Sequence, residues 1–285
     1  MSESIQLDKR NSEWPRITIV TPTFERVEFL RDCIESVLSQ NYPNLEYIIC
    51  DGGSKNSSLK DLIRSYEGRI AWWDSMPDRG HAEAIRRGFD NSTGEIMGWL
   101  CSDDYFLPGA LKAMGTAFRE NPEVDVIYGH MKTVDGDGKT LREVRAIPAI
   151  GWAAFTTANI HQPSTLWRRS AYVKAGGNVG GQNWENVVYE PNTDLFCRFI
   201  KTGVRFRRLT NFISASRVHA GTVNTLQAAK VKYVSQATFR KHFPLYGIRP
   251  VFHMIHFVMR FYQLFALVLQ GDFCYVVGWF KQKIR

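Results

Sequence analysis

The sequence predicts an α/β fold, in which a mostly parallel sheet is flanked by helices and followed by a helical C-terminal extension. Apolar, β-branched runs alternate with segments of helical periodicity over residues 16–128, which implies right-handed β-α-β crossovers. Three of the strands end in polar residues, at 21–23, 51–53 and 102–104. Because parallel sheets bind ligands at the carboxyl ends of their strands, these three ends indicate a binding site.

The first half of the chain supplies the elements in alternation. Strands are expected at 16–21 (RITIVT) and 45–50 (LEYIIC), which are rich in β-branched and apolar residues. Shorter strands are expected at 70–73, 96–100 and 124–128. The spacing of apolar residues predicts helices at 27–40, 59–66, 81–91 and 108–120.

The pattern changes after residue 128. The stretch VDGDG at 134–138 predicts a turn between two short strands. A further strand is expected at 161–167, with helices at 169–174 and 194–201. The glycine-rich stretch 176–181 lacks GxGxxG spacing after a strand, so we interpret it as a flexible loop that does not bind phosphate.

Composition and charge exclude several classes of protein. With 285 residues, 44% of them hydrophobic and 22% charged, the chain is expected to be globular and not disordered. Its net charge of +8 favours acidic partners such as nucleotide phosphates, nucleic acid or an anionic membrane. The five cysteines are scattered without CxxC spacing, which argues against a disulfide framework or a zinc site. We find neither a signal peptide nor a run of roughly 18 uncharged apolar residues, and expect a cytoplasmic protein.

The most informative segment is GEIMGWLCSDDYF, residues 94–106. An apolar run drives a buried strand that stops at Ser102, Asp103 and Asp104. Two adjacent carboxylates at a buried strand end repel each other and lose hydration. A divalent cation with oxygen ligands would remove that cost. Alternatively, the two acids only begin a turn and cap the helix near Pro108.

Six motifs in order give the chain a family resemblance. They are TIVTPTFER (18–26), ESVLSQNYPNLEYIICDGGS (35–54), DRGHAEAIRRGF (78–89), GEIMGWLCSDDYFLPGAL (94–111), HQPSTLWRR (161–169) and RVHAGTVN (217–224). Together they resemble the family 2 inverting glycosyltransferases with the Rossmann-like GT-A fold, over about residues 16–225. The resemblance divides the chain into an N-terminal extension (1–15), a GT-A domain (16–226) and a helical, amphipathic C-terminal region (227–285). Within the domain it implies a nucleotide-binding half (16–130) and an acceptor-binding half (131–226).

The resemblance also implies residue roles. A nucleoside diphosphate-sugar donor would contact Thr21, Pro22, Thr23, Glu25, Asp51, Gly52, Asp78, Arg79, Gly80, Ser102 and Asp103. The acceptor would contact His161, Gln162 and Pro163. Asp104 and His219 would ligate Mn²⁺ or Mg²⁺ bridging the diphosphate, with Asp103 binding the ribose or assisting the metal.

Structural alternatives exist for three of these residues. Asp51 alternatively stabilises an Asx-turn with Gly52. Arg79 is alternatively a solvated turn residue. His219 alternatively has a structural role, as a lone histidine more often does.

The chain departs from the family at the general base, which removes the proton of the acceptor hydroxyl. Members usually carry Asp two residues before the Asp-Leu that opens a late helix, and here that position is Asn192. An amide is not a base near neutral pH. Either Asp194 or Glu190 takes over, with Asp194 favoured because it lies at the helix start, where it alternatively serves as an N-cap. Cys101 also stands where Asn is usual.

The C-terminal region has two interpretations. Apolar residues at helical spacing over 251–265, followed by a basic tail, fit an interfacial helix on a membrane, with contact through 249–285. Alternatively this helix packs on the catalytic domain or forms a dimer interface. We favour the membrane surface.

The resemblance thus implies a metal-dependent glycosyltransferase, which we expect in the cytoplasm, either free or peripheral on the inner face of the membrane. It would move a sugar from a UDP or GDP donor to a saccharide or lipid-linked acceptor in bacterial surface polysaccharide synthesis. The alternative, suggested by Asn192, is a non-catalytic nucleotide-sugar-binding or scaffold protein. Nucleic acid is not expected as a partner, because the aromatic residues near basic ones cluster in apolar helices.

Overall fold

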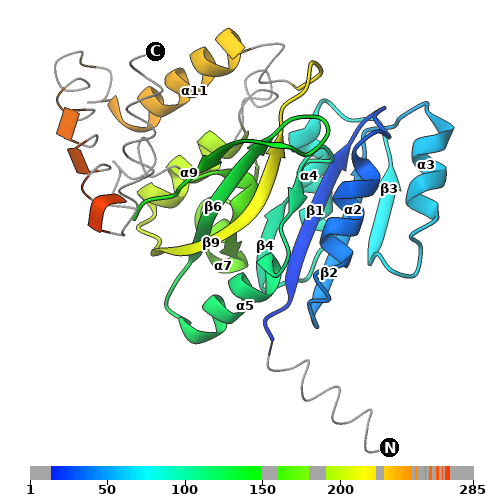
Figure 1. Cartoon of the computed structure of the whole chain (residues 1–285), viewed down its shortest axis with the longest axis horizontal. Helices are drawn as coiled ribbons and strands as arrows, with labels where there is room; N and C mark the ends of the chain where they lie inside the picture. The colour runs from blue at the N-terminus through cyan, green and yellow to red at the C-terminus, as the bar shows by residue number, and fades with distance from the viewer. Residues whose placement is uncertain are drawn as a thin grey trace, which may run out of the picture.

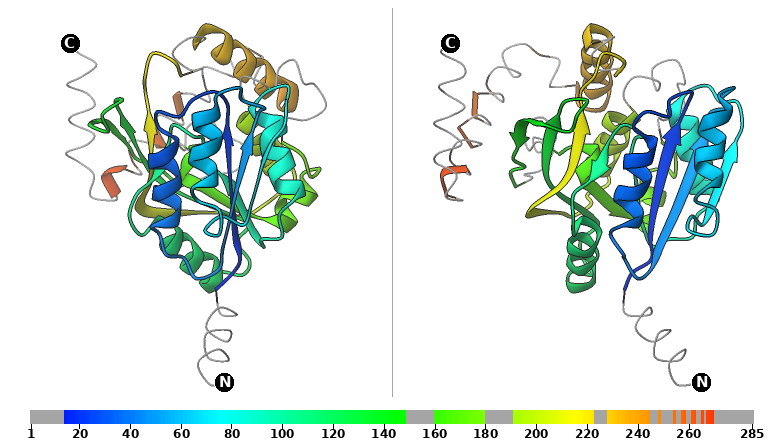
Figure 2. Two further views of the ribbon diagram at one scale, coloured as in Figure 1. Left: turned by 90° about the vertical axis from the view of Figure 1, so that its right-hand side faces the viewer. Right: turned by 45° about the vertical axis from the view of Figure 1, so that its right-hand side comes forward.

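The computed structural model describes residues 14–148, 160–179, 191–222 and 228–244, together with residue 248 and nine residues between 254 and 269. In this part the chain builds a curled nine-stranded sheet flanked by helices (Figures 1 and 2). The α/β fold expected from the sequence is confirmed.

The strands and helices follow the expected alternation. The strands are β1 (Ile17–Thr23), β2 (Leu45–Asp51), β3 (Trp72–Ser75), β4 (Ile96–Trp99), β5 (Tyr105–Phe106), β6 (Val126–Val134), β7 (Thr140–Val144), β8 (Thr165–Arg168) and β9 (Phe206–Arg217). The helices are α2 (Leu30–Leu38), α3 (Ser57–Arg64), α4 (His81–Asp90), α5 (Ala110–Glu120), α7 (Arg169–Lys174), α9 (Pro191–Lys201) and α11 (Ala228–His242).

The sheet has a parallel half and a mixed half. Its strand order is β3-β2-β1-β4-β8-β6-β9-β5, with β7 paired to β6. The pairs among β3, β2, β1 and β4 are parallel, as expected. Beyond β4 the pairs are antiparallel except for β6 with β9, so the sheet as a whole is mixed. The parallel half is the part that brings the ends of β1, β2 and β4 to one edge.

Each face of the sheet buries its own apolar cluster. In β1, Ile17 and Ile19 belong to a cluster with residues of α2, α3 and α5, whereas Val20 belongs to a cluster with α4, α7 and α9. This alternation follows from the two-residue period of a strand. Since all seven residues of β1 are buried, β1 lies between two helical layers.

Two details of β4 fix its position. Glu46 of β2 is 4% exposed and its carboxylate accepts hydrogen bonds from Thr18 Oγ1, Thr93 N, Thr93 Oγ1 and Gly94 N, so it ties β1 and β2 to the turn before β4. Gly98 lies so close to β8 that a Cβ atom there would stand 2.2 Å from Leu166 Cδ2. The start of β4 is therefore tied to β1 and β2, and its middle packs closely against β8.

Three local expectations differ in detail. The strand expected at 70–73 forms two residues later, as β3. The segment expected as a strand at 161–167 begins instead with a 3₁₀ turn, η2 (Gln162–Ser164), because Pro163 has no N–H to donate to a ladder, and only then enters β8. The expected turn after Val134 is confirmed between β6 and β7.

Some expectations fall outside the described residues. These are the N-terminal extension through residue 13, residues 180 and 181 of the glycine-rich stretch, Glu190, and most of the segment 249–285. In the described part of the chain, no helix combines the length and the apolar character that crossing a membrane requires.

Candidate functional site

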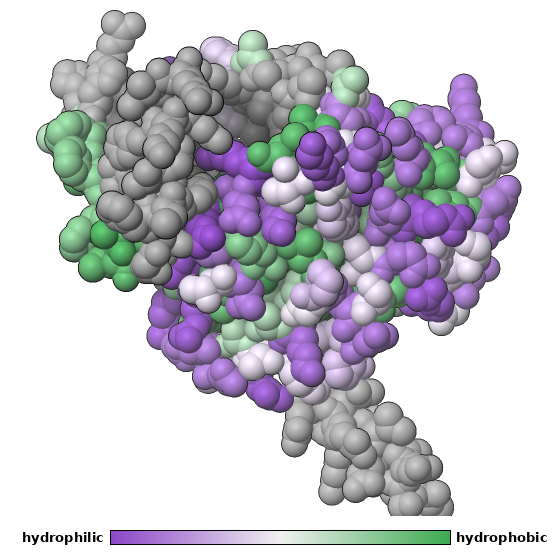
Figure 3. All heavy atoms as spheres, viewed as in Figure 1, coloured by the Kyte–Doolittle hydropathy of each residue, from purple (hydrophilic) through white to green (hydrophobic). Residues whose placement is uncertain are grey.

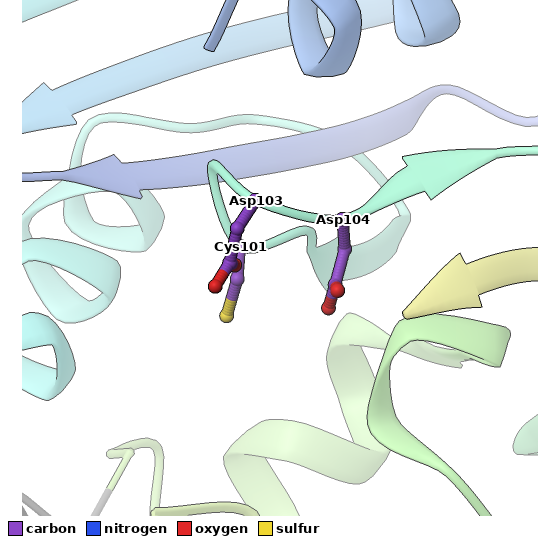
Figure 4. A group of neighbouring side chains, drawn as sticks. All are labelled: Cys101, Asp103 and Asp104. Atoms are coloured by element: carbon purple, nitrogen blue, oxygen red, sulfur yellow. The ribbon is translucent and has the colours of Figure 1, made fainter. Parts of the chain in front are cut away.

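Cys101, Asp103 and Asp104 form an acidic group in the loop that follows β4. One ligand atom from each of the three side chains lies within 4.8 Å of the others, and all three side chains point to the same side of the loop (Figure 4). Ser102 is half-buried in the same loop. The buried strand thus delivers two carboxylates and a thiol to one point at the sheet edge.

Asp104 is the buried member of this group, with 6% of its surface exposed. Its Oδ1 accepts a hydrogen bond of 3.0 Å from the backbone N–H of Arg217, the last residue of β9. Burial and the nearby charge of Asp103 raise the pKa of Asp104 well above its usual range. The pair therefore shares a site where a second negative charge is costly and a cation is favoured.

Asp103 faces His219, which comes from a loop 116 residues later in the chain. Asp103 Oδ2 lies 3.3 Å from His219 Nε2. The imidazole is held on its other side, because Nδ1 accepts a hydrogen bond of 3.2 Å from the N–H of Gly221 and the ring lies 4.8 Å from that of Phe29. Of the two acids, Asp103 is the direct partner of His219, and the group whose ligand atoms lie within 4.8 Å of one another contains Asp104 but not His219.

The loop that carries His219 is anchored to the segment after β1. The Arg217 guanidinium lies 4.4 Å above the ring of Phe29 and donates to Asp32 at 3.0 Å. Arg26 donates a hydrogen bond of 2.6 Å to the carbonyl of Gly221. These contacts bring a late segment over the edge formed by early strands.

The end of β1 contributes buried polar groups. The Thr21 hydroxyl lies 3.0 Å from that of Tyr47 inside the core, so this side chain has a structural partner. Pro22 is buried. The Thr23 Oγ1 atom is buried without a hydrogen-bond partner among the described residues, which leaves it available to a ligand. Glu25 has a positive φ of 59° and accepts a hydrogen bond from Lys55 N at 2.7 Å.

The end of β2 is an organised turn around Asp51. This fully buried carboxylate accepts hydrogen bonds from the N–H and hydroxyl of Ser54 and from the hydroxyl of Ser75. Three donors already occupy it, so Asp51 has structural partners, although its backbone donor is Ser54, three residues on, where an Asx-turn uses the residue two on. A Cβ at Gly52 would meet Asp78 Oδ2 at 3.0 Å, which places these two residues against each other.

The N-terminus of α4 lies beside this turn. Asp78 accepts a hydrogen bond of 2.9 Å from Gly80 N, and burial raises its pKa. Gly80, with a φ of 131°, is the N-cap of α4. The exposed Arg79 donates to Glu83 at 3.0 Å from both its N–H and its Nε. Free N–H groups at such a helix start favour an anion.

His81, in the first turn of α4, was missed by the sequence prediction. Burial lowers its pKa, and the negative charge of Asp103 opposes that change. The DRGH order offered a local signal, because the residue after a glycine N-cap opens the helix.

The segment predicted to bind the acceptor is tied to the end of β4. The Gln162 side chain donates to the carbonyl of Trp99 and is 6% exposed. Burial and the charge of Arg142 lower the pKa of His161 to about 4, so its imidazole is neutral near pH 7. His161 Nε2 is buried without a partner among the described residues. Pro163 lies half-buried in η2.

The helix expected to carry the base, α9, shows Asn192 half-buried near its start. Asp194 is engaged at both oxygens, since Arg198 Nε donates at 2.8 Å and His242 Nε2 lies 2.9 Å away. Although burial acts to raise it, the hydrogen bond from His242 and the charge of Arg198 lower the pKa of Asp194. A low pKa and two occupied oxygens make a weak base.

The donor atoms at the end of β4 fit a hard divalent cation. Carboxylate oxygens are the ligands that Mg²⁺ and Mn²⁺ prefer. Asp103 and Asp104 supply them, and His219 adds one imidazole nitrogen close to Asp103. The softer thiol of Cys101 is the unusual member of the set.

Comparisons with known proteins identify a family. The family model described as glycosyl transferase family 2 matches residues 18–180. An uncharacterized glycosyltransferase of Rickettsia bellii is 30% identical over 143 residues, which is 50% of this chain and 21% of that protein. The hyaluronan synthase of Pasteurella multocida is 27% identical over 219 residues, 75% of this chain and 21% of that protein. The chain spans about a fifth of the length of these relatives.

The chain is also similar to an O-antigen biosynthesis protein in sequence and to a solved structure in fold. The O-antigen biosynthesis protein RfbC of Myxococcus xanthus is 32% identical over 133 residues, 45% of this chain and 10% of that protein. The structure of S. aureus TarS 1–349 in complex with UDP-GlcNAc superimposes with a TM-score of 0.59 at 13% identity, covering 80% of this chain and 73% of that chain. At this identity the structural match shows a shared fold.

Proposed function

The chain belongs to glycosyl transferase family 2, and on that premise we propose that it transfers a sugar, with inversion, from a nucleoside diphosphate donor to a saccharide or lipid-linked acceptor. The observation that carries this proposal is the pair of carboxylates, Asp103 and Asp104, at the end of β4, with His219 in contact with Asp103. Structures of S. aureus TarS with UDP and with UDP-GlcNAc support UDP over GDP as the nucleotide.

The donor would lie along the edge formed by the ends of β1, β2 and β4. The Thr23 hydroxyl, which has no hydrogen-bond partner among the described residues, is available to the nucleotide base or the ribose of the donor. The N–H groups at the start of α4 and the guanidinium of Arg79 would face the phosphates, because both favour anions. Asp51 would support the donor indirectly, by holding the turn through Ser54 and Ser75.

We propose that Mn²⁺ or Mg²⁺ is held by Asp103 and Asp104, with His219 as a further ligand. When bound, the cation would neutralise the charge that develops on the leaving nucleoside diphosphate. Asp104 is kept in place by Arg217 N, and His219 by Gly221 N. The chain thus orients the ligands from two distant segments.

The acceptor hydroxyl needs a general base on the side of the anomeric carbon that is opposite the leaving nucleoside diphosphate. Because both oxygens of Asp194 are engaged, we propose that Asp194 fixes α9 and that Glu190 is the better candidate for the base. His161, Gln162 and Pro163 would position the acceptor, since Gln162 fastens this turn to the end of β4.

Calorimetric titration tests the donor site. UDP and GDP are titrated into the protein with Mn²⁺ and with EDTA, for the native chain and for Asp103→Asn. We expect UDP binding that requires Mn²⁺ and is lost in the variant. The matched control, Asp137→Asn, changes an exposed acid in the turn between β6 and β7 and leaves binding unchanged. If neither nucleotide binds under any metal condition, the proposal is wrong.

A second candidate function, nucleotide-sugar binding without catalysis, is favoured by Asn192. The substitution Asn192→Asp distinguishes the two. A large gain in turnover indicates a lost base, whereas unchanged measurable turnover indicates that another residue serves. Donor binding without turnover in both proteins supports the non-catalytic function.

We also propose, from the hyaluronan synthase and RfbC relatives, that the product is a bacterial surface polysaccharide made on the cytoplasmic side of the membrane.

A further inference from the structure

An exposed apolar stripe runs along the helical segment near the C-terminus. All nine described residues between 254 and 269 are helical. Seven of them expose between 43% and 70% of their surface: Met254, Phe257, Val258, Phe261, Phe265, Val268 and Leu269. Positions with this spacing of three or four residues fall on one side wherever a sequence is helical. We call these seven residues the apolar stripe.

The remaining two of these residues are less exposed and contact the protein. Leu267 is 8% exposed and belongs to the core cluster of α4, α7 and α9, and Tyr262 packs against that cluster. The Tyr262 hydroxyl donates to the carbonyl of Pro148 at 3.3 Å. The segment is therefore docked through one side and leaves the apolar stripe exposed. In Figure 3 green spheres gather at the left edge, where Figure 1 draws the short orange-to-red helical pieces.

The charge of the chain is concentrated in the same region. Residues 227–285 contain nine Lys and Arg and one acid, Asp272, whereas residues 1–226 contain 27 basic and 27 acidic residues. The whole formal net charge of +8 is thus carried by the last 59 residues. A basic segment that presents bulky apolar side chains matches the surface of an anionic bilayer.

We propose that the apolar stripe inserts into the interface of an anionic lipid membrane and that basic residues of the segment 227–285 bind its headgroups. A second copy of the chain is the less suitable partner, because pairing two such regions brings two charges of +8 together. The ring centroids of Phe257 and Phe261 lie 4.9 Å apart, so these two residues form the bulkiest part of the stripe. This inference does not depend on sugar transfer.

Vesicle binding tests the proposal without any donor. The full chain is sedimented with phosphatidylcholine vesicles, with and without phosphatidylglycerol. We expect strong binding only when phosphatidylglycerol is present, weakened by NaCl because exposed charges are screened. In the double variant Phe257→Glu, Phe261→Glu we expect the partition coefficient to fall about tenfold or more, since two large apolar side chains leave the interface.

A matched control separates apolar insertion from charge. Leu141→Glu with Val173→Glu adds the same two negative charges at positions that are 58% and 64% exposed and lie on β7 and α7. We expect this control to bind within about twofold of the native chain. Equal losses in both double variants would show that net charge alone acts, and the apolar stripe would then have no role.

Other outcomes also overturn the inference. If the native chain binds none of the vesicles, the proposal is wrong. It is also wrong if light scattering shows a native dimer that the double variant at Phe257 and Phe261 abolishes, because the apolar stripe would then join two copies of the chain. Circular dichroism checks that each variant folds. If the double variant does not fold, Leu269→Ser replaces it, because Leu269 is 70% exposed, and unchanged binding of a folded Leu269→Ser protein counts against the proposal.

Discussion

Replacing Asp194 with Asn separates a structural role from a catalytic one. The Asp194 side chain is 18% exposed, and its partners Arg198 and His242 are 16% and 10% exposed. The carboxylate lies 2.8 Å from the Arg198 Nε and 2.9 Å from the His242 Nε2. It therefore joins the first turn of α9 to the last turn of α11.

The expected cost follows from these two contacts. A hydrogen bond to a charged group contributes about 1.5–3 kcal/mol. An Asn side chain keeps one acceptor oxygen but turns its NH₂ group toward the other partner, and Arg198 loses its counter-charge. We expect Asp194→Asn to lower the free energy of unfolding by about 2–4 kcal/mol.

Urea unfolding followed by circular dichroism measures this change. The matched control is Asp61→Asn, which breaks an ion pair with Arg64 whose side chains are 66% and 55% exposed. Such an exposed pair contributes less than about 0.5 kcal/mol.

Turnover measurements test the alternative, in which Asp194 is the general base. Removal of a general base typically lowers turnover by about 10²–10⁴-fold. If Asp194→Asn leaves the free energy of unfolding within about 0.5 kcal/mol of native and lowers turnover in this range, Asp194 acts on the acceptor and the structural assignment is wrong.

Three further predictions concern the framework of the site. Burial acts to raise the pKa of Glu46, but hydrogen bonds from Thr18 and Thr93 outweigh it, and the folded pKa is lowered. The ionised Glu46 therefore stabilises the fold fully above its unfolded pKa of about 4.3, and this stabilisation is lost as pH falls through the lower folded pKa. Thermal melts from pH 7 to 3 measure the loss. The Glu46→Gln variant does not show it, and its free energy of unfolding at neutral pH is lower by about 2–4 kcal/mol. Arg26→Ala, which frees the loop of the hydrogen bond to Gly221, weakens metal-dependent nucleotide binding about three- to tenfold in calorimetry, with an unchanged melting temperature. Gly98→Ala lowers the free energy of unfolding by about 1–3 kcal/mol in urea, because its methyl group overlaps β8.

Each of these predictions has a contradicting result. An acid transition that is the same in native and Glu46→Gln proteins removes Glu46 as its cause. A fall in melting temperature for Arg26→Ala shows a general structural role. For Gly98, the control is Gly136→Ala, where a Cβ would meet nothing within 4 Å, and equal stability of the two variants contradicts the packing argument.

The early elements were predictable because their signals are local. The apolar spacing around Cys33 and Ile34 specifies α2, and the β-branched run at 17–20 specifies β1. The three polar strand ends also lie on one edge as expected, because parallel pairing of β1 with β2 and β4 fixes their register.

The later elements were harder because their surroundings come from distant segments. Strand β9 begins FRRLTN, a run with exposed positions and no clear alternation, and it forms because β6 and β5 pair with it on either side. One of the two partners of Asp194, His242, is 48 residues away in the sequence. The role of such a residue depends on the neighbour that the fold supplies.

The contact between Asp104 and Arg217 has a consequence for synthesis on the ribosome. Among the described strands, β5, which follows Asp104 directly, pairs only with β9. His219 comes two residues after the end of β9. A nascent chain that has exposed residues 17–104 already holds both carboxylates but not the partners Arg217 and His219. We therefore expect the acidic loop to stay incomplete until residue 219 has left the exit tunnel, so that a shorter nascent chain cannot sequester cation or nucleotide.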